Sequence, residues 1–264
     1  MNLKITVLAE NTSNNEAFRF EHGLSLYIET AKHKILFDTG QSSLFAENAV
    51  KMGIDLREAD IAILSHGHYD HGGGIKAFLD LNSKAPLFLS KYAFEPHYNA
   101  NDKYIGLDVS IADCDRLVYT EDILIIDDEL TLHSCNDMER KYDSSSGLSV
   151  MTDGKLIPDD FRHEQYLMIN ENNKQVLISG CSHKGILNIT HWMKPDVLIG
   201  GFHLSKTDDT EMLNECANKL LDTPTSFYTC HCTGVKQFEY LRSIVKERLN
   251  YISTGDMVII PEAY

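Results

Sequence analysis

The feature that most constrains this chain is a histidine-rich stretch between Ser65 and Gly74. The apolar run 61–64 just before it is short and β-branched, which predicts a buried strand. The end of a strand holds its side chains rigidly, as metal ligands require. Side chains able to bind a metal are concentrated at the start of the stretch, namely His66, His68, Asp70 and His71. The sequence therefore predicts a metal site on the turn that leaves a central strand.

The spacing of these side chains divides them into two pairs. His66 and His68 can converge on one cation, whereas Asp70 and His71 point elsewhere and can begin a second site. Neutral imidazole suits zinc or iron, and a carboxylate adds a hard anionic oxygen. A histidine-rich surface loop is the alternative, but tracts of this density are typical of metal binding.

The second half of the chain repeats the pattern of a strand that ends at a histidine. Strands are predicted at 175–179, 196–199 and 225–229. They lead, in that order, to His183, His203 and His231. Sites in open α/β sheets form where strand ends meet, so we expect these ends to share one sheet edge with the end of the 61–64 strand. The alternative is three separate histidines of the core.

At these residues the chain resembles the metallo-β-lactamase superfamily, whose hallmark His-x-His-x-Asp-His is present at 66–71. Asp38, in the segment Phe37-Asp38-Thr39-Gly40, matches the buried aspartate that the family places one strand earlier, behind the ligands. The resemblance implies an α/β fold, the four-layer αββα sandwich, with one or two metals at the edge of its two sheets. It covers nearly the whole chain, and no Pro/Ser-rich linker interrupts it, so we expect residues 1–264 to form a single domain.

Three further segments resemble one branch of that superfamily, which consists of largely uncharacterised hydrolases. They are 180–183 (Gly-Cys-Ser-His), 200–204 (Gly-Gly-Phe-His-Leu) and 230–234 (Cys-His-Cys-Thr-Gly). Some members of the branch are named as a 7,8-dihydropterin-6-methyl-4-(β-D-ribofuranosyl)aminobenzene-5'-phosphate synthase. Most of the superfamily places an aspartate between the two metals, often after a glycine, but neither 180–183 nor 200–203 contains one. Two full metals, one tight and one loose metal, or a single metal all remain open.

The resemblance implies a metal-dependent hydrolase, in which a bound divalent ion lowers the pKa of water to about 7. Zinc is the expected ion, with iron, manganese and nickel as alternatives. His203 is either a ligand or the group that stabilises charge on the substrate, and Asp70 could also orient the nucleophilic water. The expected ligands are His66, His68 and His183 for metal one, and Asp70, His71 and His231 for metal two.

Two alternatives to a hydrolase stay open. The name used in the branch implies a pterin-related synthase or transferase. Cysteines that flank candidate ligands, such as Cys181 and Cys232, would suit a metal or redox sensor without turnover. Small buried thiols at strand ends are the simpler interpretation of these cysteines. In each enzymatic case the expected partner is a small molecule, with phosphorylated metabolites included.

Composition argues against several other classes of protein. The net charge is −15 with histidine neutral, whereas nucleic acid binding needs a broad basic surface. No apolar run approaches the ~20 residues of a membrane span. The strand-like alternation that begins at Leu3 argues against a signal peptide, and six cysteines without disulfide spacing fit a cytoplasmic location. The oligomeric state stays open.

Other expectations concern the surroundings of the site. The polar segment 136–160 is either a lid over the site or a disordered insertion. His163 or Glu164 could supply a ligand that most of the superfamily places near this position. The chain is expected to close with a hairpin between residues 251 and 260, turned at 254–256. Surface positions are expected for the polar loop 11–15, for His97 and for Lys184, with the alternatives that the loop faces a substrate and that Lys184 meets an anionic substrate group.

Overall fold

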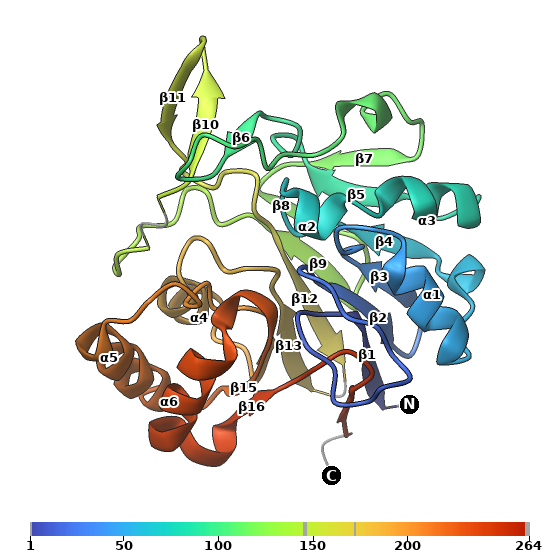
Figure 1. The fold of residues 1–264 in the computed structure, drawn as a ribbon. Helices are drawn as coiled ribbons and strands as arrows, with labels where there is room; N and C mark the ends of the chain where they lie inside the picture. The colour runs from blue at the N-terminus through green and yellow to red at the C-terminus, as the bar shows by residue number, and fades with distance from the viewer. Residues whose placement is uncertain (1, 145–146, 172, 262–264) are drawn as a thin grey trace.

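The computed structural model describes residues 2–144, 147–171 and 173–261. Within these residues the strands form two seven-stranded sheets and one three-stranded sheet. The two large sheets face each other, with helices α1 and α3 outside the first and α4, α5 and α6 outside the second (Figure 1). The predicted α/β fold, a four-layer αββα sandwich, is confirmed.

The first large sheet has the strand order β17-β1-β2-β3-β4-β5-β7. Pairing from β17 to β3 is antiparallel, and pairing from β3 to β7 is parallel. The strands are β1 (Leu3–Ala9), β2 (Ser25–Glu29), β3 (Lys34–Phe37), β4 (Ile61–Ile63), β5 (Leu87–Ser90), β7 (Leu117–Thr120) and β17 (Met257–Ile260).

The second large sheet has the order β16-β15-β14-β13-β12-β9-β8. Pairing from β16 to β13 is parallel, and pairing from β13 to β8 is antiparallel. The strands are β8 (Ile123–Ile125), β9 (Leu130–His133), β12 (Tyr166–Glu171), β13 (Lys174–Ile178), β14 (Val197–Ile199), β15 (Ser226–Thr229) and β16 (Leu249–Tyr251).

The helices cover the outer faces of both sheets. The α-helices are α1 (Leu44–Lys51), α2 (Tyr69–Gly72), α3 (Ile75–Leu81), α4 (Ile186–Met193), α5 (Thr210–Leu221) and α6 (Val235–Val245). Short 3₁₀ turns occur at η1 (Leu56–Glu58), η2 (Val109–Ile111), η3 (His231–Thr233) and η4 (Lys246–Arg248). In the described part of the chain, no helix is both long and apolar enough to span a bilayer.

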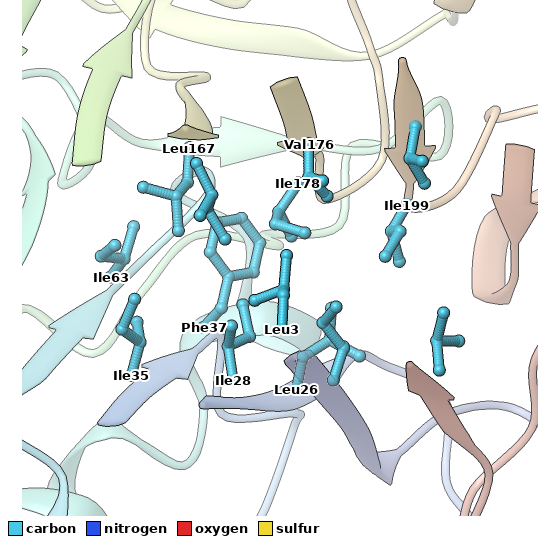
Figure 2. Packing of buried hydrophobic residues seen from close by; sticks show 14 of the residues in the cluster. Leu3, Leu26, Ile28, Ile35, Phe37, Ile63, Leu167, Val176, Ile178 and Ile199 are labelled. Atoms are coloured by element: carbon cyan, nitrogen blue, oxygen red, sulfur yellow. The ribbon is translucent and has the colours of Figure 1, made fainter. Parts of the chain in front are cut away.

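The main core lies between the two sheets. Leu26 and Phe37 of the first sheet face Leu167 and Ile178 of the second, and all four are fully buried (Figure 2). Burial of each such side chain contributes roughly 1.5–3 kcal/mol. β4 shows why the run 61–64 is apolar throughout: its isoleucines pack in this core, whereas Ala62 packs under the helices. A parallel strand with both faces covered needs apolar residues on both.

Part of the segment 136–160 is regular. β10 (Ser149–Thr152) and β11 (Lys155–Pro158) form a hairpin, and β10 also pairs with β6 (His97–Tyr98). A disordered insertion therefore does not describe 149–158. Residues 145–146 of the same segment lie outside the described residues.

The predicted hairpin at the end of the chain is wrong. β16 pairs with β15 in the second sheet, whereas β17 pairs with β1 in the first. A turn does occur between them, where the N–H of Asp256 donates to the carbonyl of Ser253 at 2.9 Å, but it carries the chain from one sheet to the other. Alternating residues around a turn fit either arrangement, because both sheets offer an edge to the arriving strand.

Candidate metal centre

The candidate ligands lie where strand ends from both large sheets meet. His66 follows β4 of the first sheet, whereas Cys181 follows β13 and His231 follows β15 of the second. The expectation that these ends share one sheet edge is therefore wrong. The histidines still come together, because the two sheets present these ends to each other: the rings of His66 and His183 have centroids 4.8 Å apart.

Close backbone packing shapes the turn after β4. A side chain at Gly67 would place its Cβ 2.2 Å from the carbonyl oxygen of Ala93. The chain then enters α2, the single-turn helix that carries Asp70 and His71. The N–H of Thr39 donates to the carbonyl of His71 at 2.7 Å, which ties α2 to the end of β3. Both residues are thus held by two neighbouring strands of the first sheet.

The buried carboxylate of Asp38 fixes the protonation of two candidate ligands. Its Oδ2 accepts from Ser65 Oγ at 2.7 Å and from His71 Nδ1 at 2.6 Å. Because the single hydroxyl proton of Ser65 goes to Asp38, Ser65 Oγ must accept from His66 Nδ1, 2.8 Å away. His66 and His71 therefore both present the lone pair of Nε2, the form that binds a metal.

Strained backbone occurs at this meeting point, as it does at several other turns of the described chain. Left-handed φ angles occur at Asp38 (58°), Ser182 (59°), His203 (53°) and His231 (49°). A non-glycine residue held in this conformation lowers the free energy of unfolding by about 1–3 kcal/mol. Such conformations persist where the surrounding structure forces them, and they cluster at functional sites.

One group of converging ligand atoms comes from His66, Cys181 and His183, and we call it the His66 group. The Nε2 atoms of its two histidines are 3.3 Å apart, and all three residues are buried. Phe161 stacks on the ring of His183 with centroids 4.7 Å apart. Nδ1 of His183 has no hydrogen-bond partner among the residues that the structure describes.

A second group comes from His71, Cys181 and His231, with Asp70 beside it, and we call it the Asp70 group. Nε2 of His71 is 3.2 Å from Nε2 of His231 and 3.1 Å from Cys181 Sγ. Asp70 Oδ2 lies 3.4 Å from Nε2 of His231, and the exposed His22 approaches the same oxygen at 3.1 Å. The structure thus brings Asp70, His71 and His231 together and adds Cys181, which was not among the predicted ligands.

Two residues that sequence reasoning missed hold His231. Asn11 Oδ1 accepts from His231 Nδ1 at 2.7 Å, which leaves the Nε2 lone pair free to face the Asp70 group. Glu10 Oε1 accepts from the backbone N–H of His231 at 2.7 Å. The start of loop 11–15 therefore reaches the site, contrary to the expected surface position. Nothing in the local sequence marks Asn11, because its role depends on where β15 ends.

Glu164 and Lys184 form a buried support beneath His183. Glu164 Oε1 accepts from the backbone N–H of His183 at 2.7 Å, so Glu164 holds a candidate ligand in place. Lys184 is fully buried, and its Nζ donates to the carbonyl of Ser134 at 2.6 Å and to Asn136 Oδ1 at 2.8 Å. The predicted surface position of Lys184 is wrong, because residues 134–136 cover it. Burial lowers the pKa of its ammonium to about 8.

A third buried group consists of His68, His97, Asp159 and His163. His97 Nδ1 donates to Asp159 Oδ2 at 2.9 Å. The N–H of Gly67 donates to His163 Nδ1 at 2.9 Å, so His163 carries its proton on Nε2, 3.3 Å from Asp159 Oδ2. The predicted surface position of His97 is wrong, because β6 pairs with β10 and turns the ring inward.

His68 lies between this third group and the His66 group. Its ring centroid is 4.6 Å from that of His66 and 4.9 Å from that of His183, the two residues expected to share a metal with it. Its ligand atom, however, converges with those of the third group. Nε2 of His68 has no hydrogen-bond partner within the described ranges.

His203 lies beside the ligand groups. Its ring centroid is 4.4 Å from that of His183, but within the described residues it belongs to none of the converging groups. Both histidines line a cavity of about 500 Å³. Lys141 and Tyr142 of the segment 136–160 also line it. A cavity of this size fits a small metabolite.

Burial and nearby charge set the protonation of the candidate ligands. Burial lowers the pKa well below its usual value for His66, His68 and His183, and to about 4 for His203 and His231. Burial also acts on His71, but Asp38 and Asp70 outweigh it and raise its pKa. Burial alone would raise the pKa of Asp70, but His71 leads the neighbours that hold it well below its usual range. Burial raises the pKa of the Cys181 thiol.

These atoms fit divalent metal ions. The paired Nε2 atoms are 3.2 Å and 3.3 Å apart, and a tetrahedral shell with metal–nitrogen bonds of about 2.0–2.1 Å spaces its nitrogens about 3.3 Å apart. Converging lone pairs and a carboxylate repel one another unless a positive charge lies between them.

Comparison with known proteins connects the chain to one family. The family model of the Metallo-beta-lactamase superfamily matches residues 19–156. An uncharacterized protein of Methanocaldococcus jannaschii is 30% identical over 253 residues, which cover 91% of this chain and 94% of that protein. The 7,8-dihydropterin-6-methyl-4-(beta-D-ribofuranosyl)-aminobenzene-5'-phosphate synthase of the same organism is 29% identical and covers 97% of this chain and 96% of the synthase.

A solved structure supports the same connection. Tm1679, described as a metal-dependent hydrolase of the beta-lactamase superfamily, has a TM-score of 0.82 and 28% sequence identity with this chain. The match covers 97% of this chain and 98% of Tm1679. The likeness therefore extends over nearly the whole length of both chains.

Proposed function

The chain belongs to the metallo-beta-lactamase superfamily, and we propose that it is a metal-dependent hydrolase of a small metabolite. The observation that carries this proposal is the convergence of imidazole nitrogens from both sheets on two groups that share Cys181. The likeness to Tm1679, itself described as a metal-dependent hydrolase, supports the same class of reaction.

In this proposal the His66 group and the Asp70 group each hold one divalent ion, with zinc expected first. His66 and His183 would hold the first ion. His68 would join them after a rotation of its ring. This rotation costs no hydrogen bond of His68 Nε2, because Nε2 has no partner among the described residues. The second ion is held by Asp70, His71 and His231.

A bound divalent ion supplies Lewis acidity, which lowers the pKa of water to about 7 and polarises a substrate oxygen. The protein's own residues then position the reactants. Asp70 stays ionised beside its imidazole neighbours and can accept a hydrogen bond from the attacking water. His203, with a pKa of about 4, is neutral at pH 7 and donates an N–H to the substrate oxygen on which charge develops. Among the described residues, His203 belongs to none of the converging ligand groups, so we assign it the charge-stabilising role rather than the ligand role.

The cavity beside His183 and His203 is the proposed substrate site. Lys141 adds an ammonium group to its lining and Tyr142 adds an aromatic side chain with a hydroxyl. An ammonium group and hydroxyl donors suit an anionic substituent such as a phosphate. The same lining carries the carboxylates of Asp143, Asp209 and Glu215, so the proposed substrate class is a small metabolite, with phosphorylated metabolites included.

Metal content and turnover test the proposal together. Protein purified without added metal or chelator should contain about two ions per chain by elemental mass spectrometry, and His183→Ala and His231→Ala should each lose about one. Turnover of generic phosphodiesters or esters after zinc, manganese or iron loading should disappear in His66→Ala. A single ion, lost only in His183→Ala, would require a mechanism built on one metal. Protein that binds no metal would contradict the proposal.

A pterin-related synthase is the second candidate, because a relative matched over 96% of its length carries that name. It can be tested with a pyrophosphate-activated reduced pterin and a ribofuranosylaminobenzene phosphate. Release of pyrophosphate only when both are present, with formation of the joined product, would favour the synthase over the hydrolase. Tight metal binding without either reaction would favour a sensor.

A further inference from the structure

Cys181 stands at the point that both ligand groups share. The ligand atoms of His66, Cys181 and His183 lie within 4.8 Å of one another, and so do those of His71, Cys181 and His231, so Cys181 Sγ belongs to both sets. Among the residues that the structure describes, it is the one member common to these two groups. Its side chain is buried, and its Sγ is 3.1 Å from Nε2 of His71. Cys181 thus faces the site from the second sheet while His66 and His71 face it from the first.

The backbone next to Cys181 is fixed against the residues that orient the histidines. A Cβ at Gly180 would come within 2.2 Å of Ser65 Oγ, the hydroxyl that links Asp38 to His66. The N–H of Gly201 donates to the carbonyl of Gly180 at 2.9 Å. The position of the sulfur is therefore set by the same contacts that set the imidazoles.

Sulfur in this place can do what an oxygen ligand does in related sites. Cys181 follows Gly180 at the end of β13, in one of the two segments where the resemblance to the superfamily implies an aspartate after a glycine. A thiolate has one negative charge, like a carboxylate, and binds zinc at about 2.3 Å. It also has more than one lone pair, so a single sulfur atom can bind two ions.

We infer that the thiolate of Cys181 bridges the two metal ions in place of the bridging aspartate, an inference that rests on the proposed function. On binding, the S–H bond breaks, the proton passes to solvent, and the sulfur forms one bond to each ion. Because sulfur is a softer ligand than oxygen, the site is expected to select zinc, cobalt or iron(II) over manganese or magnesium.

The neighbouring thiol of Cys232 provides a matched control. Its Sγ lies 3.5 Å from the carbonyl oxygen of Cys181 and accepts from the backbone N–H of His203 at 3.3 Å. It is buried like Cys181 but, among the described residues, belongs to neither ligand group. A serine at 232 keeps an acceptor for the N–H of His203, so Cys232→Ser removes a nearby thiol without removing a proposed ligand.

Titration of the metal-stripped full chain with cobalt(II) tests the bridge. Cobalt bound to a thiolate gives an intense near-ultraviolet charge-transfer absorption, which cobalt bound to nitrogen and oxygen alone lacks. The absorption should grow through both the first and the second equivalent in the native chain. It should be absent from Cys181→Ser and unchanged in Cys232→Ser. Cys181→Asp should bind two ions without the absorption. This result would show that the site survives when a carboxylate replaces the sulfur.

The other outcomes separate this inference from the proposed function. If the absorption stopped growing after one equivalent while a second ion still bound, the sulfur would contact one ion only and the bridge would be refuted. Absorption that persisted in Cys181→Ser would assign it to another thiol. Two bound cobalt ions with no such absorption would overturn the bridge and leave the hydrolase proposal standing. A chain that bound neither cobalt nor zinc would overturn both.

Discussion

The two ligand groups that meet at Cys181 differ in how firmly their imidazoles are held. In the Asp70 group, Nδ1 of His71 donates to Asp38 and Nδ1 of His231 donates to Asn11. In the His66 group, Nδ1 of His66 has a partner, but Nδ1 of His183 has none among the described residues. The Asp70 group also has a carboxylate. Outer hydrogen bonds fix the tautomer and raise ligand basicity, so the Asp70 group should bind its ion more tightly.

The sequence left open whether the chain holds two full metals, one tight and one loose metal, or a single metal. The structure gives the Asp70 group two outer acceptors and a carboxylate whose pKa is held well below its usual range. The order of the two metal affinities therefore tests whether the outer hydrogen bonds or the missing aspartate decides which ion is bound more tightly.

The largest effect should come from removing His71, which contacts both Asp38 and the shared Cys181. We expect His71→Ala to lose the ion of the Asp70 group and to reduce kcat/KM by more than about 100-fold, since even outer partners of ligands cost 10–100-fold. His191→Ala, at an exposed histidine of α4, is the control. If His71→Ala kept turnover within a few-fold of the native chain, the assignment of the Asp70 group as a metal site would be contradicted.

Asp38→Asn should weaken metal binding by both groups at once. The carboxylate accepts from His71 directly and orients His66 through Ser65, and an amide cannot accept all of these hydrogen bonds. Each dissociation constant should rise about 10–100-fold, measured by competition with a chromophoric chelator. An effect confined to one ion would show that the two groups do not share this support.

Asn11→Ala should weaken metal binding by the Asp70 group alone, because among the described residues Asn11 hydrogen-bonds to His231 and to no residue of the His66 group. The tighter constant should rise by about 10-fold, at the lower end of the range for outer partners. Asn11→Asp keeps an acceptor for His231 Nδ1 and should restore the affinity. An equal loss of affinity for both ions would contradict the proposed difference between the two groups.

The smallest effect concerns pH and the metal-stripped chain. Burial lowers the pKa of His203 from 6.5 to about 4, so the unfolded chain binds more protons than the folded one between these values. Its contribution to stability is complete above pH 6.5 and is lost as pH falls to about 4, with an upper bound of about 3 kcal/mol. In urea unfolding from pH 7 to pH 4, His203→Gln should therefore lose less stability than the native chain. The same loss in both would contradict the burial argument.

Local pattern was enough for the parts of the site that lie close together in the sequence. The strand at β4, the turn after it and the candidate ligands from His66 to His71 follow from adjacent residues. The histidines after β13 and β15 could also be predicted, because each ends an apolar run. Cys181 follows a glycine in one of the two segments where the resemblance implied an aspartate, but the sequence alone did not select it as a ligand.

Burial by distant segments could not be predicted in this way. Lys184 has the sequence context of a solvated lysine, but residues 134–136 supply its acceptors. His97 is polar and isolated in the sequence, but Asp159 accepts from it across 62 positions. Asn11 meets His231 across 220 positions. Each contact depends on which segment crosses over which strand end, and neighbouring residues do not encode that.

The sequence by itself determined which candidate ligands stand at strand ends, because strand periodicity and residue spacing are local properties, and the resemblance to the metallo-β-lactamase superfamily implied the αββα class. Tertiary structure alone decided that the strand ends come from opposing sheets, that β16 and β17 separate, and that Cys181 faces both ligand groups. The physical reason is that sheet pairing and the packing of two sheets bring together residues more than a hundred positions apart, such as His71 and Cys181.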